Sequence, residues 1–96
     1  MTVMDKEYLE GYLVNYVGSL RALQLWFHSA HILAKGTGFA GDHVHLYGEI
    51  YNQITEEIDT AIEKAVGITN DEVMACPRVI TYKALEVLMD YPVPTN

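Results

Sequence analysis

The stretch His31-Ile-Leu-Ala-Lys-Gly-Thr-Gly-Phe-Ala-Gly-Asp-His43 lies between two long segments of helical periodicity. Three of the six residues from position 36 to position 41 are glycine, and glycine at this density favours a turn over a continued helix. We therefore predict one long helix from about residue 4 to 35 and a second from about 43 to 66. Two long helices joined by a short connection run antiparallel, so the sequence predicts a helical hairpin.

Apolar residues recur at three- and four-residue steps on both sides of this turn, which is the spacing of one helix face. Before the turn they are Leu9, Leu13, Tyr16, Val17, Leu20, Leu23 and Phe27, and after it they are Tyr47, Ile50, Tyr51, Ile54, Ile58, Ala61, Ile62 and Ala65. Asp42 is expected to cap the start of the second helix, and Gly67 is expected to end it.

The remaining residues predict two short helices. Thr69-Asn-Asp-Glu72 has the form of a capping box and predicts a helix over about 70–76. Pro77 breaks that helix and fits the start of a last one, over about 78–90. The chain 1–96 is thus expected to be a single all-α domain, an antiparallel hairpin with short C-terminal helices. A domain this small buries little surface by itself, so we expect self-association, at least to a dimer, to complete a bundle.

The composition limits the kinds of molecule that this protein is expected to bind. The chain has 13 acidic and 6 basic residues and a formal charge of -7. This balance argues against direct DNA binding, because affinity for phosphate depends on Lys and Arg. The single cysteine, Cys76, fits a reducing compartment, and no apolar run approaches the roughly 20 residues that span a bilayer. We therefore expect a soluble, cytoplasmic protein without a membrane partner.

Two carboxylates and four histidines are the candidate metal ligands. Asp59 and Glu63 are four residues apart, so both project from one face of the second helix. Carboxylate oxygens combined with imidazole suit Fe(II), Mn(II) or Zn(II). The histidines are His28, His31, His43 and His45, all within eighteen positions around the turn. An acidic pair at this spacing is also typical of a solvated helix face, and a histidine on an apolar stripe is often a core residue.

The ordered set of His31, the Lys35-Gly36-Thr37-Gly38-Phe39 turn, His43, Asp59 and Glu63 resembles a known family. The segment from about Leu20 to Gly67 is similar to the first two helices of the Dps (DNA-protection-during-starvation) branch of the ferritin-like superfamily. The third and fourth long helices of that family have no counterpart here. The resemblance therefore implies a shortened form, in which two copies supply one bundle.

The resemblance also implies a mechanism. Proteins of this family bind Fe(II) between two chains, with histidines from one chain and carboxylates from its partner. By resemblance, His31 and His43 are metal ligands facing Asp59 and Glu63 of another copy. Oxygen or peroxide is the expected oxidant, so ferroxidase activity is an open expectation. The competing interpretation is a non-catalytic helical assembly module, a structural subunit of a larger particle.

Overall fold

The computed structural model describes residues 5–34 and 45–95. Within these ranges the chain is helical and contains no strand. Its elements are α1 (Lys6–Leu33), α2 (Glu49–Thr69), the short 3-10 helix η3 (Glu72–Ala75) and α3 (Pro77–Leu88). The all-α prediction is confirmed for the described residues.

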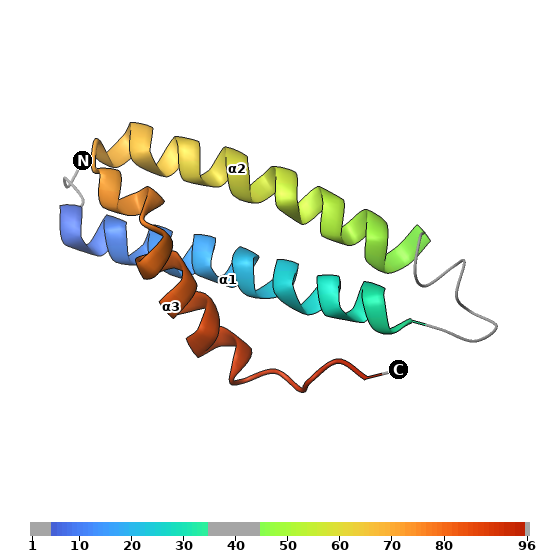
Figure 1. The fold of residues 1–96 in the computed structure, drawn as a ribbon. Coiled ribbons are helices and arrows are strands. Elements are labelled where there is room, and N and C mark those ends of the chain that lie inside the picture. Colours follow the sequence, from blue (N-terminus) through green and yellow to red (C-terminus); the bar gives the residue numbers. More distant parts are fainter. Residues whose placement is uncertain (1–4, 35–44, 96) are drawn as a thin grey trace.

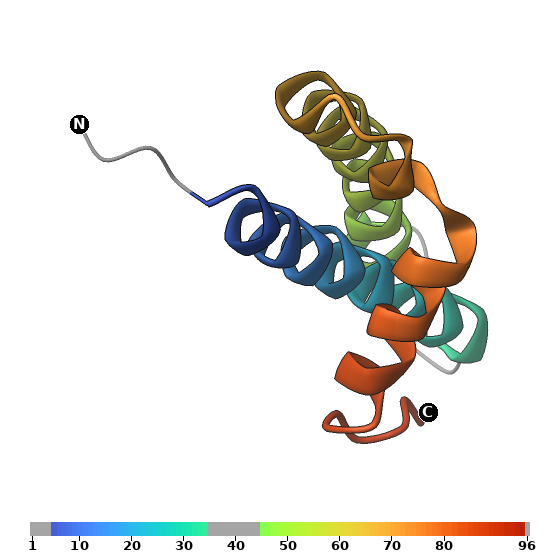
Figure 2. The same ribbon diagram turned by 90° about the vertical axis from the view of Figure 1, so that its left-hand side faces the viewer.

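Helix α1 packs against α2, α3 and η3. Figure 1 shows α1 and α2 side by side and running in opposite directions, with α3 crossing α1 at a steep angle. The end-on view in Figure 2 shows that η3 and α3 lie along one side of the α1–α2 pair. Residues 45–48 form a π-helical turn that leads directly into α2. His43 and the predicted cap Asp42 lie outside the described residues.

Different interactions determine where α1 begins and where α2 ends. The Asp5 carboxylate caps α1 by accepting hydrogen bonds from the backbone N–H groups of Glu7 (2.8 Å) and Tyr8 (3.3 Å). Helix α2 continues past Gly67 and ends at Thr69, because Asn70 adopts the left-handed conformation (φ 53°) there. The prediction that Gly67 ends this helix is therefore wrong. Asn70 tolerates the left-handed conformation better than most non-glycine residues.

The predicted capping box at Thr69 is also wrong. Thr69 belongs to α2, where its hydroxyl donates to the carbonyl of Ala65 (2.7 Å). Asp71 is the residue that caps η3, since its carboxylate accepts a hydrogen bond from the N–H of Val73 (3.0 Å). Pro77 occupies the first turn of α3 as predicted, where its missing N–H leaves no bond unmade.

Small side chains dominate the core, so the helices approach one another closely. The buried apolar residues are Val17, Ala22, Ala30, Ala34, Ile58, Ala65, Met74, Ile80 and Ala84. One close approach is at Gly18, where a Cβ atom would lie 2.7 Å from Cβ and 2.5 Å from Cγ of Lys83. The chain after α3 returns along α1, and the Trp26 Nε1–H donates to the Pro92 carbonyl (2.7 Å).

Candidate functional site

A stripe of polar side chains runs along the groove between α1 and α2. Its members recur every three or four residues on each helix, which places them on one face of that helix. On α1 they are Arg21, Gln24, His28 and His31, and on α2 they are Tyr51, Thr55 and Asp59. We call this stripe the polar groove. It contains His31 and Asp59 of the predicted metal site, whereas Glu63 is exposed one turn farther along α2, about 120° around the helix from Tyr51.

Hydrogen bonds fix the middle of the polar groove. The Gln24 Nε2–H donates to the Thr55 hydroxyl (3.0 Å), and that hydroxyl donates to the Tyr51 carbonyl (2.8 Å). On the other side, Arg21 Nη1 donates to Gln24 Oε1 (2.8 Å). Gln24 is buried, so these partners replace the water that its amide has lost. Both ends of the Gln24 amide are thus held in one orientation.

Aromatic contacts set the register nearer the end of α1. The His28 ring stacks on Tyr51 with centroids 4.6 Å apart and an interplanar angle of 20°. One residue before, Phe27 lies against Tyr47 with centroids 6.1 Å apart. Position 28 of α1 is therefore level with position 51 of α2, just as position 24 is level with position 55.

The predicted ligands lie at opposite ends of the polar groove. Eight residues of α2 separate Tyr51 from Asp59, which is about 12 Å along the helix axis, and Glu63 lies about 6 Å farther on. His31 lies beyond His28 in the other direction, half-buried in the last turn of α1. A single chain therefore does not bring His31 to Asp59 and Glu63.

The two carboxylates are open to solvent. Asp59 and Glu63 are both exposed on α2, and Asp59 borders a hollow of about 590 Å³ together with Arg21. In the described ranges, no three His, Cys, Asp or Glu side chains lie close enough together to hold a metal ion. The fourth predicted ligand, His43, lies outside these ranges. Within one copy, the described residues thus provide an exposed pair of oxygen ligands but no complete coordination set.

Glu10 and Cys76 lie outside the polar groove, and both have shifted pKa values. A hydrogen bond with Asp71, together with burial, raises the pKa of Glu10 above its usual 4.5. Hydrogen bonds from the backbone N–H groups of Val79 and Arg78 lower the pKa of the Cys76 thiol. Cys76 is half-buried just before α3, and its Sγ therefore faces the first free N–H groups of that helix.

Sequence analysis did not single out several residues that shape this region. Gln24 interrupts an otherwise apolar series, and this was a signal that a polar partner faces it across the groove. Thr55 on α2 is that partner, four residues before Asp59. Gly18 carried no visible signal, because its importance depends on which residue of α3 crosses it.

The chain was compared with protein-family models, curated proteins and solved structures, and none of them matches it. The described helices also include none that is both long enough and apolar enough to cross a bilayer.

Proposed function

We propose that this protein is a Dps-like member of the ferritin-like superfamily that binds Fe(II) at sites formed between two copies of the chain. His31 and His43 of one copy would face Asp59 and Glu63 of the other. The observation that supports the proposal is that His31 and Asp59 lie at opposite ends of one polar groove, with Glu63 one turn beyond Asp59 on the exposed side of α2. When a second copy is placed antiparallel to the first, the histidine end of each copy faces the carboxylate end of the other.

The register between α1 and α2 determines where the twofold axis of such a dimer would lie. His28 is level with Tyr51, so His31 is level with about position 48 of α2. A twofold axis that crosses α2 near Ile54 would exchange that level with the level of Asp59 and Glu63. Twofold dimers pair the same patch on both copies, so the two ligand sets would meet twice. Antiparallel packing of two hairpins would also supply the helices that one chain lacks.

The donor types suit iron as a substrate. Carboxylate oxygens favour the hard ferric product, and imidazole is a good ligand for Fe(II). In the oxidation, two Fe(II) ions would each give one electron to a peroxide molecule. The O–O bond then breaks, and two protons complete two molecules of water. Glu63 would bind iron most directly, with Asp59 beside it.

The test is an anaerobic Fe(II) titration, followed by addition of peroxide or oxygen. Saturable binding and fast oxidation are expected for the wild type, and both should be lost in His31→Ala and in Glu63→Ala. Glu72→Ala is the matched control, because Glu72 is an exposed acid on η3 and outside the groove. Binding that is equal in all four proteins would overturn the proposal.

Mixing the two inactive variants tests whether the site is shared. A heterodimer of His31→Ala and Glu63→Ala copies keeps one intact site, because the intact histidine and the intact glutamate come from different chains. Random pairing should therefore restore about a quarter of the wild-type sites. A site contained within one chain would give no recovery on mixing.

A second candidate function is a non-catalytic helical assembly module. The observation that favours it is the number of large apolar side chains on the surface, among them Tyr82 (67% exposed), Leu85 (56%) and Met89 (77%). Under this interpretation the histidines and carboxylates are ordinary groove residues. The iron titration separates the two functions, since an assembly module needs no saturable Fe(II) site.

A further inference from the structure

The outer face of α3 carries an exposed stripe. Arg78, Tyr82, Leu85 and Met89 are spaced by four, three and four residues, so they lie on one side of the helix. The opposite side buries Ile80 and Ala84. Alternating three- and four-residue spacing, as in this stripe, is typical of a helix that packs lengthwise against another. Nothing in the described chain covers the stripe, since all four of its residues are exposed.

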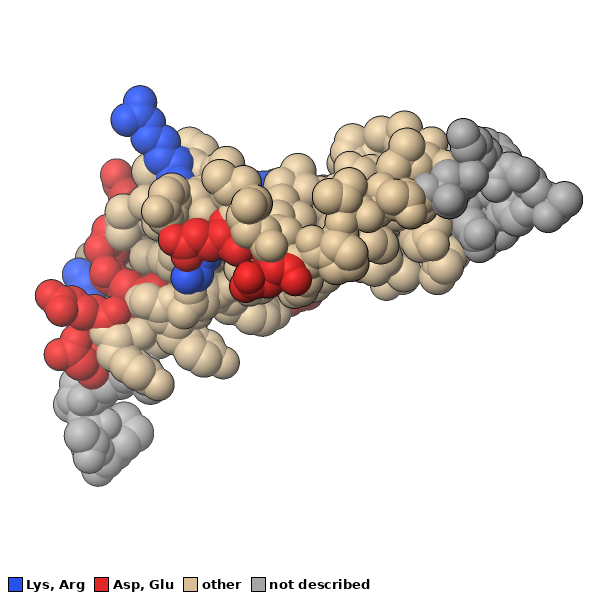
Figure 3. Space-filling model, turned by 90° about the horizontal axis from the view of Figure 1, so that it is seen from below, with Lys and Arg blue, Asp and Glu red and all other residues tan. Residues whose placement is uncertain are grey.

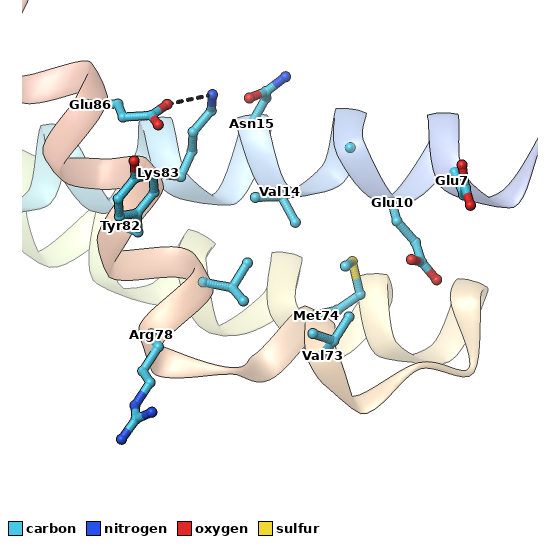
Figure 4. Close-up of a pocket in the computed structure, with 12 residues that line it drawn as sticks. Glu7, Glu10, Val14, Asn15, Val73, Met74, Arg78, Tyr82, Lys83 and Glu86 are labelled. Atoms are coloured by element: carbon cyan, nitrogen blue, oxygen red, sulfur yellow. Dashed lines mark hydrogen bonds and ion pairs between the residues drawn. The ribbon is translucent and has the colours of Figure 1, made fainter.

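An apolar groove adjoins the stripe. It measures about 740 Å³ and lies between the first half of α1 and the segment formed by η3 and α3. Figure 4 shows Val14, Val73 and Met74 pointing into this space, with Tyr82 at its α3 edge. The Cβ position of Gly11, on the α1 wall, has no atom within 4 Å. Tyr82 belongs to both the stripe and the groove, and the groove lining also includes the charged residues Glu7, Glu10, Arg78, Lys83 and Glu86.

The accessible surface of the chain is larger than that of a compact monomer of the same mass. Its accessible area is 6718 Å², whereas a compact monomer of 10.8 kDa exposes about 5,500 Å². A standard interface buries about 800 Å² of each partner, so the exposed surface is large enough for one. The radius of gyration, 15.6 Å, likewise exceeds the roughly 12.5 Å of a compact domain of this length.

Charges on α3 identify a second copy as the occupant. Arg78 and Glu86 lie four residues on either side of Tyr82, and both are exposed. Arg78 has no ion-pair partner in the described part of the chain, whereas Glu86 pairs only with the neighbouring Lys83 (3.0 Å). If two α3 helices meet antiparallel beside Tyr82, each Arg78 faces the partner's Glu86. The helix is therefore complementary to itself in charge as well as in apolar pattern.

Charged side chains are unevenly distributed over the molecule. Figure 3 shows Asp and Glu side chains gathered toward the end of the molecule that carries the N-terminus, with little charge over the rest of this face. An antiparallel pair of α3 helices would place Met89 of each copy level with residue 75 of the other. The partner's Met89 would then approach the groove beside Val73.

We propose that two copies of this chain associate through α3, antiparallel about a twofold axis beside Tyr82. In this dimer, Tyr82 contacts the partner's Tyr82, Leu85 covers the partner's Val79, and Arg78 pairs with the partner's Glu86. This interface is separate from the polar groove, and the inference does not rest on the iron proposal. A chain that used both surfaces would form assemblies larger than a dimer.

The first test measures mass in solution by light scattering and sedimentation, with a chelator present to remove iron. Wild type from about 1 to 100 µM should associate, and Leu85→Glu should weaken association by about tenfold or more. The matched control is Ile68→Glu, because Ile68 is equally exposed (65%) but lies on α2. All these residues are on the surface, so far-UV circular dichroism should be unchanged. A monomeric wild type, or equal masses for all three proteins, would overturn the proposal.

A charge exchange tests the geometry. Arg78→Glu and Glu86→Arg should each weaken association, because like charges would face one another across the axis. The double variant should restore most of it. A cysteine at the axis gives a second measure: in a Cys76→Ser background, Tyr82→Cys should form a disulfide-linked dimer, and Thr60→Cys on α2 should not. Failure of both the charge rescue and the cross-link would exclude this arrangement, whatever the outcome with iron.

Discussion

The first half of α1 packs against α3 through a close approach at Gly18, whereas the second half packs against α2 through polar side chains. At Gly18, an added Cβ atom would meet Lys83 at 2.5 Å and 2.7 Å. Along the second half, Gln24 bonds Thr55 and His28 stacks on Tyr51. The first contact excludes any added atom. The second tolerates a change of shape but requires that buried hydrogen-bonding groups keep their partners.

The largest effect is expected at the close crossing. Gly18→Ala should lower the free energy of unfolding by about 1–3 kcal/mol, because α3 must move away to admit the methyl group. In open surroundings the same change gains about 0.5–1 kcal/mol by restricting the unfolded chain. Gly67→Ala provides this control, since a Cβ atom there has no atom within 4 Å. Urea denaturation of both variants measures the difference, and a stabilised Gly18→Ala protein would contradict the close packing.

A smaller loss is expected in the polar groove. Gln24→Ala removes the acceptor of Arg21 and the donor to Thr55, so the free energy of unfolding should fall by about 1–2 kcal/mol. A double-mutant cycle with Thr55→Ala isolates the hydrogen bond between the two side chains. Its coupling energy should be about 0.5–1.5 kcal/mol. Full additivity of the two losses would show that this bond contributes nothing in solution.

The smallest effect is a pH dependence where α1 meets η3. Hydrogen bonding to Asp71 raises the pKa of Glu10 above 4.5, and Lys6, with its Nζ 3.7 Å from Glu10 Oε1, opposes this shift. The proton on Glu10 is thus held more tightly in the folded state. Its contribution to stability is complete below pH 4.5 and is lost as the pH rises through the raised pKa.

Glu10→Gln tests this contribution, because an amide can donate to Asp71 at every pH. The variant should be more stable than wild type at pH 7, and the difference should shrink as the pH falls toward 4.5. Asp71 acts in the opposite sense: its lowered pKa gives stability that is present above pH 3.8 and is lost on further acidification. Thermal midpoints from about pH 2 to 8 measure both trends. Parallel curves for the two proteins would show that Glu10 titrates normally.

Local patterns predicted the elements better than their ends. The three- and four-residue apolar spacing identified both long helices, since a helix face is a property of one segment alone. The helix ends depended instead on which of several neighbouring residues stops the helix. Gly67 remains helical because its surroundings impose no turn, and Asn70 takes the left-handed conformation instead. Thr69 had the right type for a cap but bonds back to Ala65 inside α2.

The candidate site was predictable in its residue types and not in its geometry. The spacing of Asp59 and Glu63 already placed both carboxylates on one face of a helix. The relative level of α1 and α2 comes from the Gln24–Thr55 and His28–Tyr51 contacts, which join positions far apart in the sequence. That register is what separates His31 from the carboxylates within one chain.

The sequence by itself determined that the described chain is helical, roughly where its two long helices lie, and which residues have the chemistry of metal ligands. These are properties of short segments and of single side chains. Only the tertiary structure decided that α3 crosses α1 at Gly18, that polar residues fill the α1–α2 groove, and that the α3 stripe faces outward. Those features depend on how helices remote in sequence are placed, and the packing of the whole chain sets that placement.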